Sequence, residues 1–271
     1  MRPVCVIGDF DNLRAQGVRF LQEAARLGPL HAHLLDDEAS AAMRGAAPKF
    51  SLAERRYFLE SLRFVARVTP VGRDAPGGMP PCADRTARWA FGPGAERPGS
   101  CAGWDGDGIE CIDFRAEDLA GYPDPVAGGA PPEPGARRVI VTGCYDWFHS
   151  GHVRFFEEVS ALGDLYVVVG HDANIRLLKG EGHPMFSQEE RRYLAACVRY
   201  VREALISSGD GWLDAEPEIA RVRPHIYAVN EDGDRPEKRA FCEANGIEYA
   251  VLKREPAPGL PRRSSTDLRG F

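Results

Sequence analysis

The chain has 271 residues, of which 44% are hydrophobic and 27% are charged. Its length accommodates one large domain or two small ones, and its composition is that of a globular protein with a buried core. The formal net charge of −6 at pH 7 argues against a sequence-independent nucleic-acid binder, which needs a basic face for the phosphate backbone.

No apolar run approaches the roughly 20 residues that a membrane-spanning helix needs. Residues 1–10 read as a strand and not as a signal peptide, so the sequence predicts a cytoplasmic protein. The seven cysteines are scattered without Cys-x-x-Cys spacing, which favours reduced thiols, mostly in the core. A zinc site from Cys82, Cys101 and Cys111 is the alternative, but the spacings are irregular and no fourth ligand is evident. We therefore predict no metal held by protein ligands.

The sequence contains the same pattern twice. Residues 8–11 (GDFD) match residues 143–146 (GCYD), and residues 54–57 (ERRY) match residues 190–193 (ERRY). The other matched segments, in chain order, are 18–20 with 153–155, 27–28 with 162–163, 50–51 with 186–187 and 108–110 with 246–248. The offset drifts only from 135 to 138 residues along this series, so we infer an internal duplication.

The two copies are separated by a segment rich in proline, glycine and alanine (PDPVAGGAPPEPGA). Such a composition does not build a packed element and is typical of an extended linker. The predicted organisation is a first domain at residues 1–120, a linker at 121–137 and a second domain at 138–271.

The second copy reads as alternating strands and helices. Strands are predicted at residues 138–142, 164–170, 204–207, 225–229 and 247–252. Helices are predicted at 151–162 and at 187–200, the latter opened by a capping box of Ser187 and Glu190. Apolar strands that alternate with helices indicate a parallel sheet covered by helices on both faces. The fold class is therefore α/β, with two tandem Rossmann-like domains, and ligands are expected beyond the carboxyl ends of the strands.

Two histidines follow the first strand of the second copy, in the stretch GCYDWFHSGH. Gly143 ends the strand, and His149 and His152 flank Gly151 where the next helix begins. A helix N-terminus favours phosphate, and imidazoles there can donate hydrogen bonds to phosphoryl oxygens as negative charge builds up. Capping or surface histidines are the alternative for an isolated HxxH, but the two glycines and the upstream strand favour a phosphate site.

This stretch resembles the HxGH signature of the nucleotidyltransferase superfamily, most closely that of the cytidylyltransferases for phosphocholine, phosphoethanolamine and glycerol 3-phosphate. Lys179-Gly180, followed by residues 186–192 (FSQEERR), is similar to the family's lysine loop and ERR helix. Residues 263–269 (RSSTDLR) resemble its closing S-T-T segment. The resemblance covers the whole second copy.

The resemblance implies a role for each catalytic candidate. His149 and His152 would bind the β- and α-phosphates and stabilise the pentacoordinate phosphorus. Lys179 would bridge the incoming phosphate and the α-phosphate, and Arg191 would contact the nucleotide or the acceptor phosphate. The alternatives are a solvated loop lysine at 179 and a surface charge paired with a glutamate at 191.

The nucleotide-binding set is larger. Ser265 and Thr266 would hold the β- and γ-phosphates, Asp146 would shape the loop, and Asp232 would lie where the family reads base and ribose. The set is completed by Gly143, Cys144 and Gly151. Residues 230–234 could instead form only a polar turn. Tyr145, Trp147 and Trp212 are candidate acceptor contacts, although a core role is expected for each.

The closing motif departs from the family pattern R-T-x-G-I-S-T-T. Here Arg254 lies well upstream, and residues 259–266 read GLPRRSST. Which arginine binds phosphate therefore stays open, and so does the choice between CTP and ATP.

The resemblance implies a direct reaction without a covalent intermediate. A phosphate oxygen of the acceptor attacks the α-phosphorus in line and pyrophosphate leaves, so catalysis consists of positioning and charge stabilisation. Mg²⁺ is expected, bound largely through the triphosphate. The predicted function is transfer from CTP to a phosphorylated small alcohol, polyol or sugar, with no nucleic-acid partner.

The first copy has lost these residues. Residues 14–17 (RAQG) stand where the second copy has 149–152 (HSGH), and nothing stands opposite Ser265-Thr266. We predict a catalytically dead copy. Because single-copy relatives work as homodimers, the fused repeat can supply their two-fold contact as an intramolecular pseudo-dimer, with a further homodimer or a sensor role as alternatives.

Three other functions are alternatives. An ATP-dependent adenylyltransferase shares the HxGH chemistry and is the first alternative. A regulatory nucleotide-binding protein without turnover is disfavoured, because the second copy keeps motifs that the first has lost. An aminoacyl-adenylate-forming enzyme would need a larger body and a tRNA-binding surface.

Overall fold

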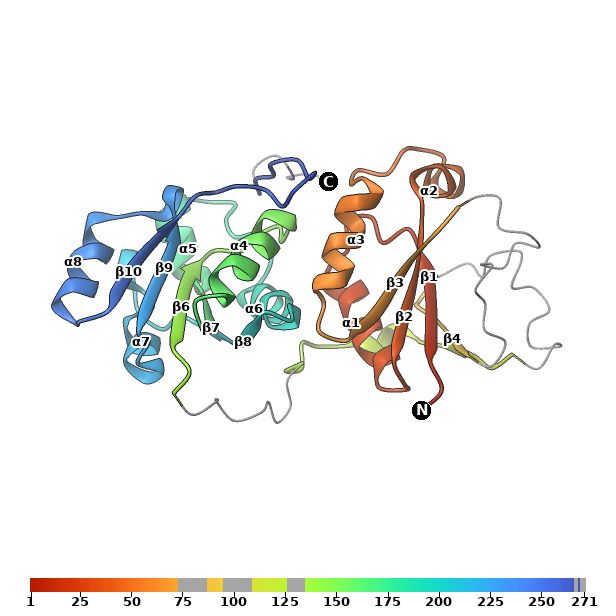
Figure 1. The fold of residues 1–271 in the computed structure, drawn as a ribbon, viewed down its shortest axis with the longest axis horizontal. Coiled ribbons are helices and arrows are strands. Elements are labelled where there is room, and N and C mark those ends of the chain that lie inside the picture. The colour runs from red at the N-terminus through yellow and green to blue at the C-terminus, as the bar shows by residue number, and fades with distance from the viewer. Residues whose placement is uncertain (73–86, 95–108, 126–134, 266–267, 269–271) are drawn as a thin grey trace. The chain divides into compact units, whose positions relative to one another are not determined.

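The computed structural model describes residues 1–72, 87–94, 109–125, 135–265 and 268 (Figure 1). The chain divides into two compact units, Met1–Gly121 and Tyr122–Phe271. The predicted linker at 121–137 lies partly outside the described residues, which exclude 126–134. Each unit contains a five-stranded sheet whose paired strands are parallel, as the sequence predicted.

The first unit has the strand order β3-β2-β1-β4-β5. Its strands are β1 (Val4–Gly8), β2 (Leu30–Leu35), β3 (Val65–Val71), β4 (Arg88–Phe91) and β5 (Cys111–Asp113). Its described helices are α1 (Ala15–Ala25), α2 (Asp37–Arg44), α3 (Leu52–Ser61) and the short 3-10 turn η3 (Ala116–Leu119).

The second unit has the order β10-β9-β6-β7-β8. Its strands are β6 (Arg138–Gly143), β7 (Asp164–Val169), β8 (Val201–Ile206), β9 (Ile226–Asn230) and β10 (Glu248–Leu252). Its helices are α4 (Ser150–Ser160), α5 (Asp172–Lys179), α6 (Gln188–Cys197), α7 (Glu216–Val222) and α8 (Pro236–Ala244), with 3-10 turns η4 (Gly211–Leu213) and η5 (Glu231–Gly233). All five strands and both helices predicted for this copy are present.

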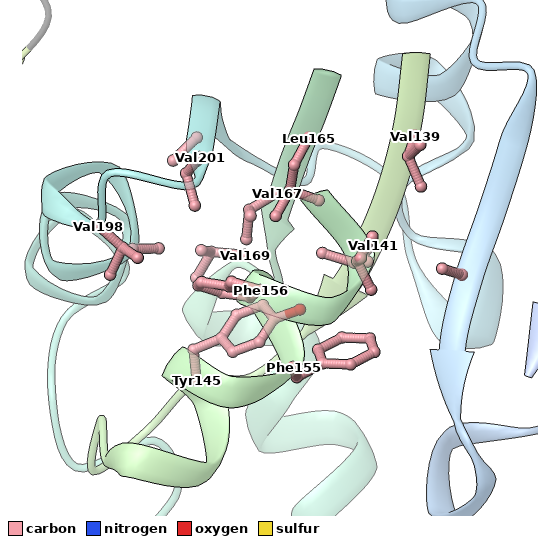
Figure 2. Packing of buried hydrophobic residues seen from close by; sticks show 14 of the residues in the cluster. Val139, Val141, Tyr145, Phe155, Phe156, Leu165, Val167, Val169, Val198 and Val201 are labelled. Atoms are coloured by element: carbon pink, nitrogen blue, oxygen red, sulfur yellow. The ribbon is translucent and has the colours of Figure 1, made fainter. Parts of the chain in front are cut away.

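Helices cover both faces of the second sheet because its strands are apolar on both sides. On one face, α4 and α6 pack against alternate valines such as Val139 and Val141, as Figure 2 shows, with Tyr145 beside Phe156. On the other face, Ile140 and Tyr227 of the sheet pack against α7 and α8. In the first unit, the segments between β3 and β4 and between β4 and β5, where counterparts of α7 and α8 would fall, lie mostly at 73–86 and 95–108, outside the described residues.

The two sheets have the same strand order, as expected for an internal duplication. Starting from β1 or from β6, the chain adds two strands on one side of the sheet and then two on the other side. The direction reverses beside β6, which lies between β9 and β7 (Figure 1). Such a reversal opens a crevice beyond the carboxyl ends of the strands, the usual ligand position in open α/β sheets.

Candidate active site

The segment between β6 and α4 is a tight loop with two residues in the left-handed region. Tyr145 has φ of 53° and Trp147 has φ of 49°, uncommon values for bulky residues. The matching residues of the first unit, Phe10 and Asn12, have φ of 48° and 53°. Both copies therefore fold the same loop, although only the second carries histidines after it.

The loop is held by its own polar groups. The buried Asp146 carboxylate accepts hydrogen bonds from the backbone N–H groups of Met185 (3.0 Å) and Phe186 (3.2 Å). The Ser265 hydroxyl donates to the Asp146 carbonyl at 2.6 Å. Asp146 thus ties this loop to the segment before α6, and Ser265 brings the C-terminal segment against the same loop.

His149 caps α4 and has a defined tautomer. Its Nδ1 accepts a hydrogen bond from the Gly151 N–H at 3.0 Å, which places the ring proton on Nε2. A Cβ on Gly151 would lie 2.9 Å from His149 Cε1, so only glycine fits beside this ring. The cap therefore leaves His149 as an Nε2–H donor at a helix N-terminus.

His152 lies against His149, with ring centroids 4.0 Å apart. Burial, aided by the nearby His149, Arg254 and Lys179, holds the pKa of His152 well below its ordinary value. Its Nδ1 is buried without a hydrogen-bond partner among the described residues. A neutral imidazole with an unused ring nitrogen is suited to contact a phosphoryl oxygen.

A cavity of about 280 Å³ opens above these histidines at the carboxyl ends of β6 and β9. It brings together most of the predicted site residues. Those on its wall are Gly143, Cys144, Asp146, His149, Gly151, His152, Lys179, Asp232 and Ser265. Thr266, the remaining hydroxyl of the predicted set, lies outside the described residues.

Lys179 and Arg254 supply positive charge at this cavity. Lys179 is the last residue of α5, and no described residue forms an ion pair with it. Arg254 donates to the Asp232 carboxylate at 2.5 Å and to the Arg263 carbonyl at 3.1 Å. Arg254 is therefore the arginine that lies with the histidines, despite its distance in sequence from the closing segment.

Arg191 occupies a different position from the predicted one. Its side chain is fully buried, with 0% exposed, and it does not line the cavity. The guanidinium donates to the carbonyls of Phe186, Cys144 and Gly170 and to the Asp172 carboxylate, at 2.6–2.9 Å. A phosphate contact for Arg191 is thus corrected to a structural role, which ties the loops after β6 and β7 to α6.

The first unit shows the same architecture without the same chemistry. Arg55 repeats the Arg191 contacts, donating to the carbonyls of Phe50, Asp9 and Leu35 and to the Asp37 carboxylate. Arg44 ends α2 as Lys179 ends α5, but it forms ion pairs with Asp9 and Asp11 at 2.9 Å each. The cation at this position is therefore neutralised by carboxylates and is not presented to a phosphate.

The tryptophans and cysteines of the site have ordinary environments. Trp147 is buried and its indole N–H points to the Met185 sulfur, whereas Trp212 is 46% exposed beneath the Arg235 guanidinium. Burial raises the pKa of the Cys144 thiol. No group of three or more His, Cys, Asp or Glu side chains suited to a metal occurs among the described residues, and Cys82 and Cys101 lie outside them.

Lys238 was not among the predicted site residues, yet it reaches the cavity from α8 although it is only 8% exposed. Thr142 and Asn230, at the ends of β6 and β9, also line the cavity. Their position at the end of a predicted strand, or directly after it, was the available signal. Nothing in the local pattern distinguished Lys238 from a solvated helix lysine.

Comparison with known proteins places the second unit among the nucleotidyltransferases that its motifs resemble. A family model described as cytidylyltransferase-like matches residues 140–269. The FAD synthase of Aciduliprofundum boonei is 32% identical over 136 residues, which cover 49% of this chain and 84% of that protein. The bifunctional protein HldE of Pelobacter propionicus is 36% identical over 99 residues, 36% of this chain. The match spans only 20% of the HldE protein.

Among solved structures, a lipopolysaccharide core biosynthesis protein from Thermoplasma volcanium is 25% identical. That match covers 45% of this chain and 99% of that chain, with a TM-score of 0.39. Separately, the described part of the chain contains no helix of the length and apolarity needed to cross a bilayer.

Proposed function

The chain belongs to the cytidylyltransferase-like family of nucleotidyltransferases, and on that premise we propose that its second unit joins a nucleoside triphosphate to a phosphorylated small molecule. The observation that carries the proposal is the cavity at the carboxyl ends of β6 and β9. It combines two histidines at a helix N-terminus with the cations Lys179 and Arg254. Such a site is suited to a polyphosphate and to the charge that develops at its α-phosphorus.

The proposed reaction is a single in-line displacement. A phosphate oxygen of the acceptor attacks the α-phosphorus, a new P–O bond forms, and the bond to the β-phosphate oxygen breaks to release pyrophosphate. A phosphate monoester is already a nucleophile near neutral pH, so no general base is required. The Nε2–H of His149 and the ring of His152 would stabilise the oxygens of the pentacoordinate phosphorus, while Lys179 holds the incoming phosphate.

Magnesium is proposed to enter with the triphosphate. The described residues offer no cluster of three metal-ligating side chains, and the Asp146 carboxylate is engaged by two backbone N–H groups. Mg²⁺ commonly binds proteins through substrate phosphates, and the absence of a cage among the described residues is compatible with that mode. The charge it would supply adds to that of Lys179, which has no ion-pair partner among the described residues.

ATP is the donor that we favour, a change from the CTP predicted by sequence motifs. The FAD synthases of Aciduliprofundum boonei and Ferroglobus placidus are relatives matched over most of their length, and they are named for a product that contains an adenylyl group. CTP remains the second candidate because the histidine loop most resembles that of cytidylyltransferases. The acceptor is proposed to be a phosphorylated alcohol, polyol, sugar or flavin.

The test is release of pyrophosphate from ATP and from CTP, with magnesium, across a panel of such phosphate monoesters. Acceptor-dependent release with one nucleotide would support the proposal and identify the donor. Each positive pair is repeated with the unphosphorylated acceptor, which should be inactive. If the purified chain binds nucleotide but no monoester of the panel causes pyrophosphate release, the alternative of a regulatory protein without turnover would replace this proposal.

A further inference from the structure

Lys238 is a buried cation at the candidate site, and the reaction proposed above assigns no role to it. It lies in the first turn of α8, its side chain is 8% exposed, and it lines the same cavity as His152 and Lys179. Only four of the 34 lysines and arginines are lysines, and two of these four line this cavity. A compact ammonium is thus retained here in a chain that otherwise uses arginine.

The ammonium lacks a carboxylate partner. Its Nζ donates to the Thr142 hydroxyl at 3.3 Å and lies 5.5 Å from the centre of the Tyr227 ring, and no described residue forms an ion pair with it. The nearby Asp214 carboxylate accepts a hydrogen bond from the Ser207 hydroxyl instead. Burial lowers the pKa of Lys238, and the charges of Asp214 and Asp234 offset this effect only in part. Burying an ammonium without an ion pair costs several kcal/mol of folding free energy. An anion that binds beside Lys238 would therefore stabilise the folded protein.

The partners of Lys238 hold it in place rather than neutralise it. The Thr142 hydroxyl shares a second hydrogen bond with the Tyr227 hydroxyl at 2.7 Å, which fixes the oxygen that receives the lysine. An ammonium has three N–H donors, and Thr142 uses one of them. The remaining donors are available to a ligand that enters the cavity.

The direction of approach distinguishes Lys238 from the other cations. α4, with its two histidines, packs on one face of the sheet, whereas α8 packs on the opposite face. Thr142 alternates with Val141 along β6, so its side chain points toward the α8 face. Lys238 therefore reaches the ends of β6 and β9 from the side opposite the helix N-terminus where the nucleotide phosphates are proposed to bind.

We propose that Lys238, held by Thr142, binds the phosphate of the acceptor opposite the leaving pyrophosphate. This inference rests on the proposed function, because an in-line displacement requires the attacking phosphate and the leaving group on opposite sides of the α-phosphorus. Lys238 on α8 and Lys179 on α5 would then both bind the phosphate of the acceptor. Lys238 is a specificity-determining residue that selects an acceptor carrying a dianionic phosphate over its neutral alcohol.

The experiment measures inorganic phosphate binding to the full chain by calorimetry. The nucleotide site is first saturated with the α,β-methylene analogue of ATP or CTP, which cannot release pyrophosphate. Wild type is compared with Lys238→Met, which keeps the side-chain length without the charge, and with Lys253→Met. Lys253 is exposed and does not line this cavity, so its replacement controls for the loss of one positive charge.

We expect Lys238→Met to weaken phosphate binding at least about tenfold, since a charge-assisted hydrogen bond is lost, while binding of the analogue changes less than about twofold. Lys253→Met should change neither. Equal weakening of phosphate and analogue would place Lys238 in the nucleotide site and overturn the inference. Unchanged phosphate binding, or no phosphate binding by the wild-type complex, would also overturn it.

A second measurement distinguishes failure of this inference from failure of the proposed function. If the analogue does not bind wild type, the proposed function is contradicted, and phosphate titrations of nucleotide-free wild type and Lys238→Met still decide whether Lys238 binds an anion. The ligand-free Lys238→Met variant should melt at the same or a higher temperature than wild type, because it removes an unpaired buried charge. A large fall in melting temperature would show a structural role and count against the inference.

Discussion

His152 carries the most direct prediction at the scale of single residues. Its ring lies at the cavity beside His149 and also packs against Tyr145 and Phe148, so replacement by alanine removes a proposed stabiliser of the transition state together with these ring contacts. We expect His152→Ala to lower turnover at least about 100-fold while the variant stays folded at the assay temperature. Arg14→Ala, at the His149 position of the first unit, should keep wild-type turnover. Pyrophosphate release measures both, and more than about a tenth of wild-type activity in His152→Ala would contradict the assigned role.

His33 gives a prediction for stability in the first unit. It is buried and stacked on Trp89, and burial, with smaller effects of His31 and Arg67, lowers its pKa to about 4. The unfolded chain binds this proton near pH 6.5, so the unfolded state gains stability as the pH falls from about 6.5 to 4. The expected loss of folding free energy across this window is about 3 kcal/mol.

His33→Phe should remove that part of the acid sensitivity, because phenylalanine keeps the stack on Trp89 but binds no proton. Urea unfolding at pH 7 and pH 4, followed by tryptophan fluorescence, measures the difference between the variant and wild type. Equal acid destabilisation of the two proteins would show that His33 is not the group that titrates.

At the scale of elements, the two units differ in what faces the cation at the end of the second helix. Asp9 pairs with Arg44 in the first unit, and Cys144 stands at the Asp9 position in the second unit, where Lys179 has no ion-pair partner among the described residues. We expect Cys144→Asp to neutralise Lys179 and repel phosphate, lowering turnover at least about 100-fold. Cys144→Ser, of similar size and uncharged, should retain most of the activity. Similar activities in the two variants would refute this account.

The strands and motifs of the second unit could be predicted because they depend on local patterns. The valine-rich runs of β6 and β7 specify buried parallel strands, and the glycine that ends β6 marks the loop that leads into the next helix. The environment of Arg191 could not be read in this way. Its carbonyl partners come from the loops after β6 and β7 and from just before α6, so its burial follows from tertiary packing. Lys238 was missed for the same reason.

At the scale of the whole molecule, the fused repeat is proposed to replace the two-fold contact of single-copy homodimers. The two units share topology, loop conformation and the buried arginine, while the candidate catalytic side chains occur in the second unit. We expect a monomer of 29.8 kDa by sedimentation velocity at micromolar concentration. A stable dimer would contradict a contact satisfied within one chain and favour the further homodimer.

The central claim is that the second unit binds a nucleoside triphosphate at the two histidines. It is tested most directly by calorimetric titration of ATP and of CTP, each with magnesium, into wild type and into a His149→Ala, His152→Ala double variant. The account predicts that one nucleotide, ATP by preference, binds wild type and that this binding is lost in a folded double variant. Absence of binding to wild type, or undiminished binding to the double variant, would contradict it.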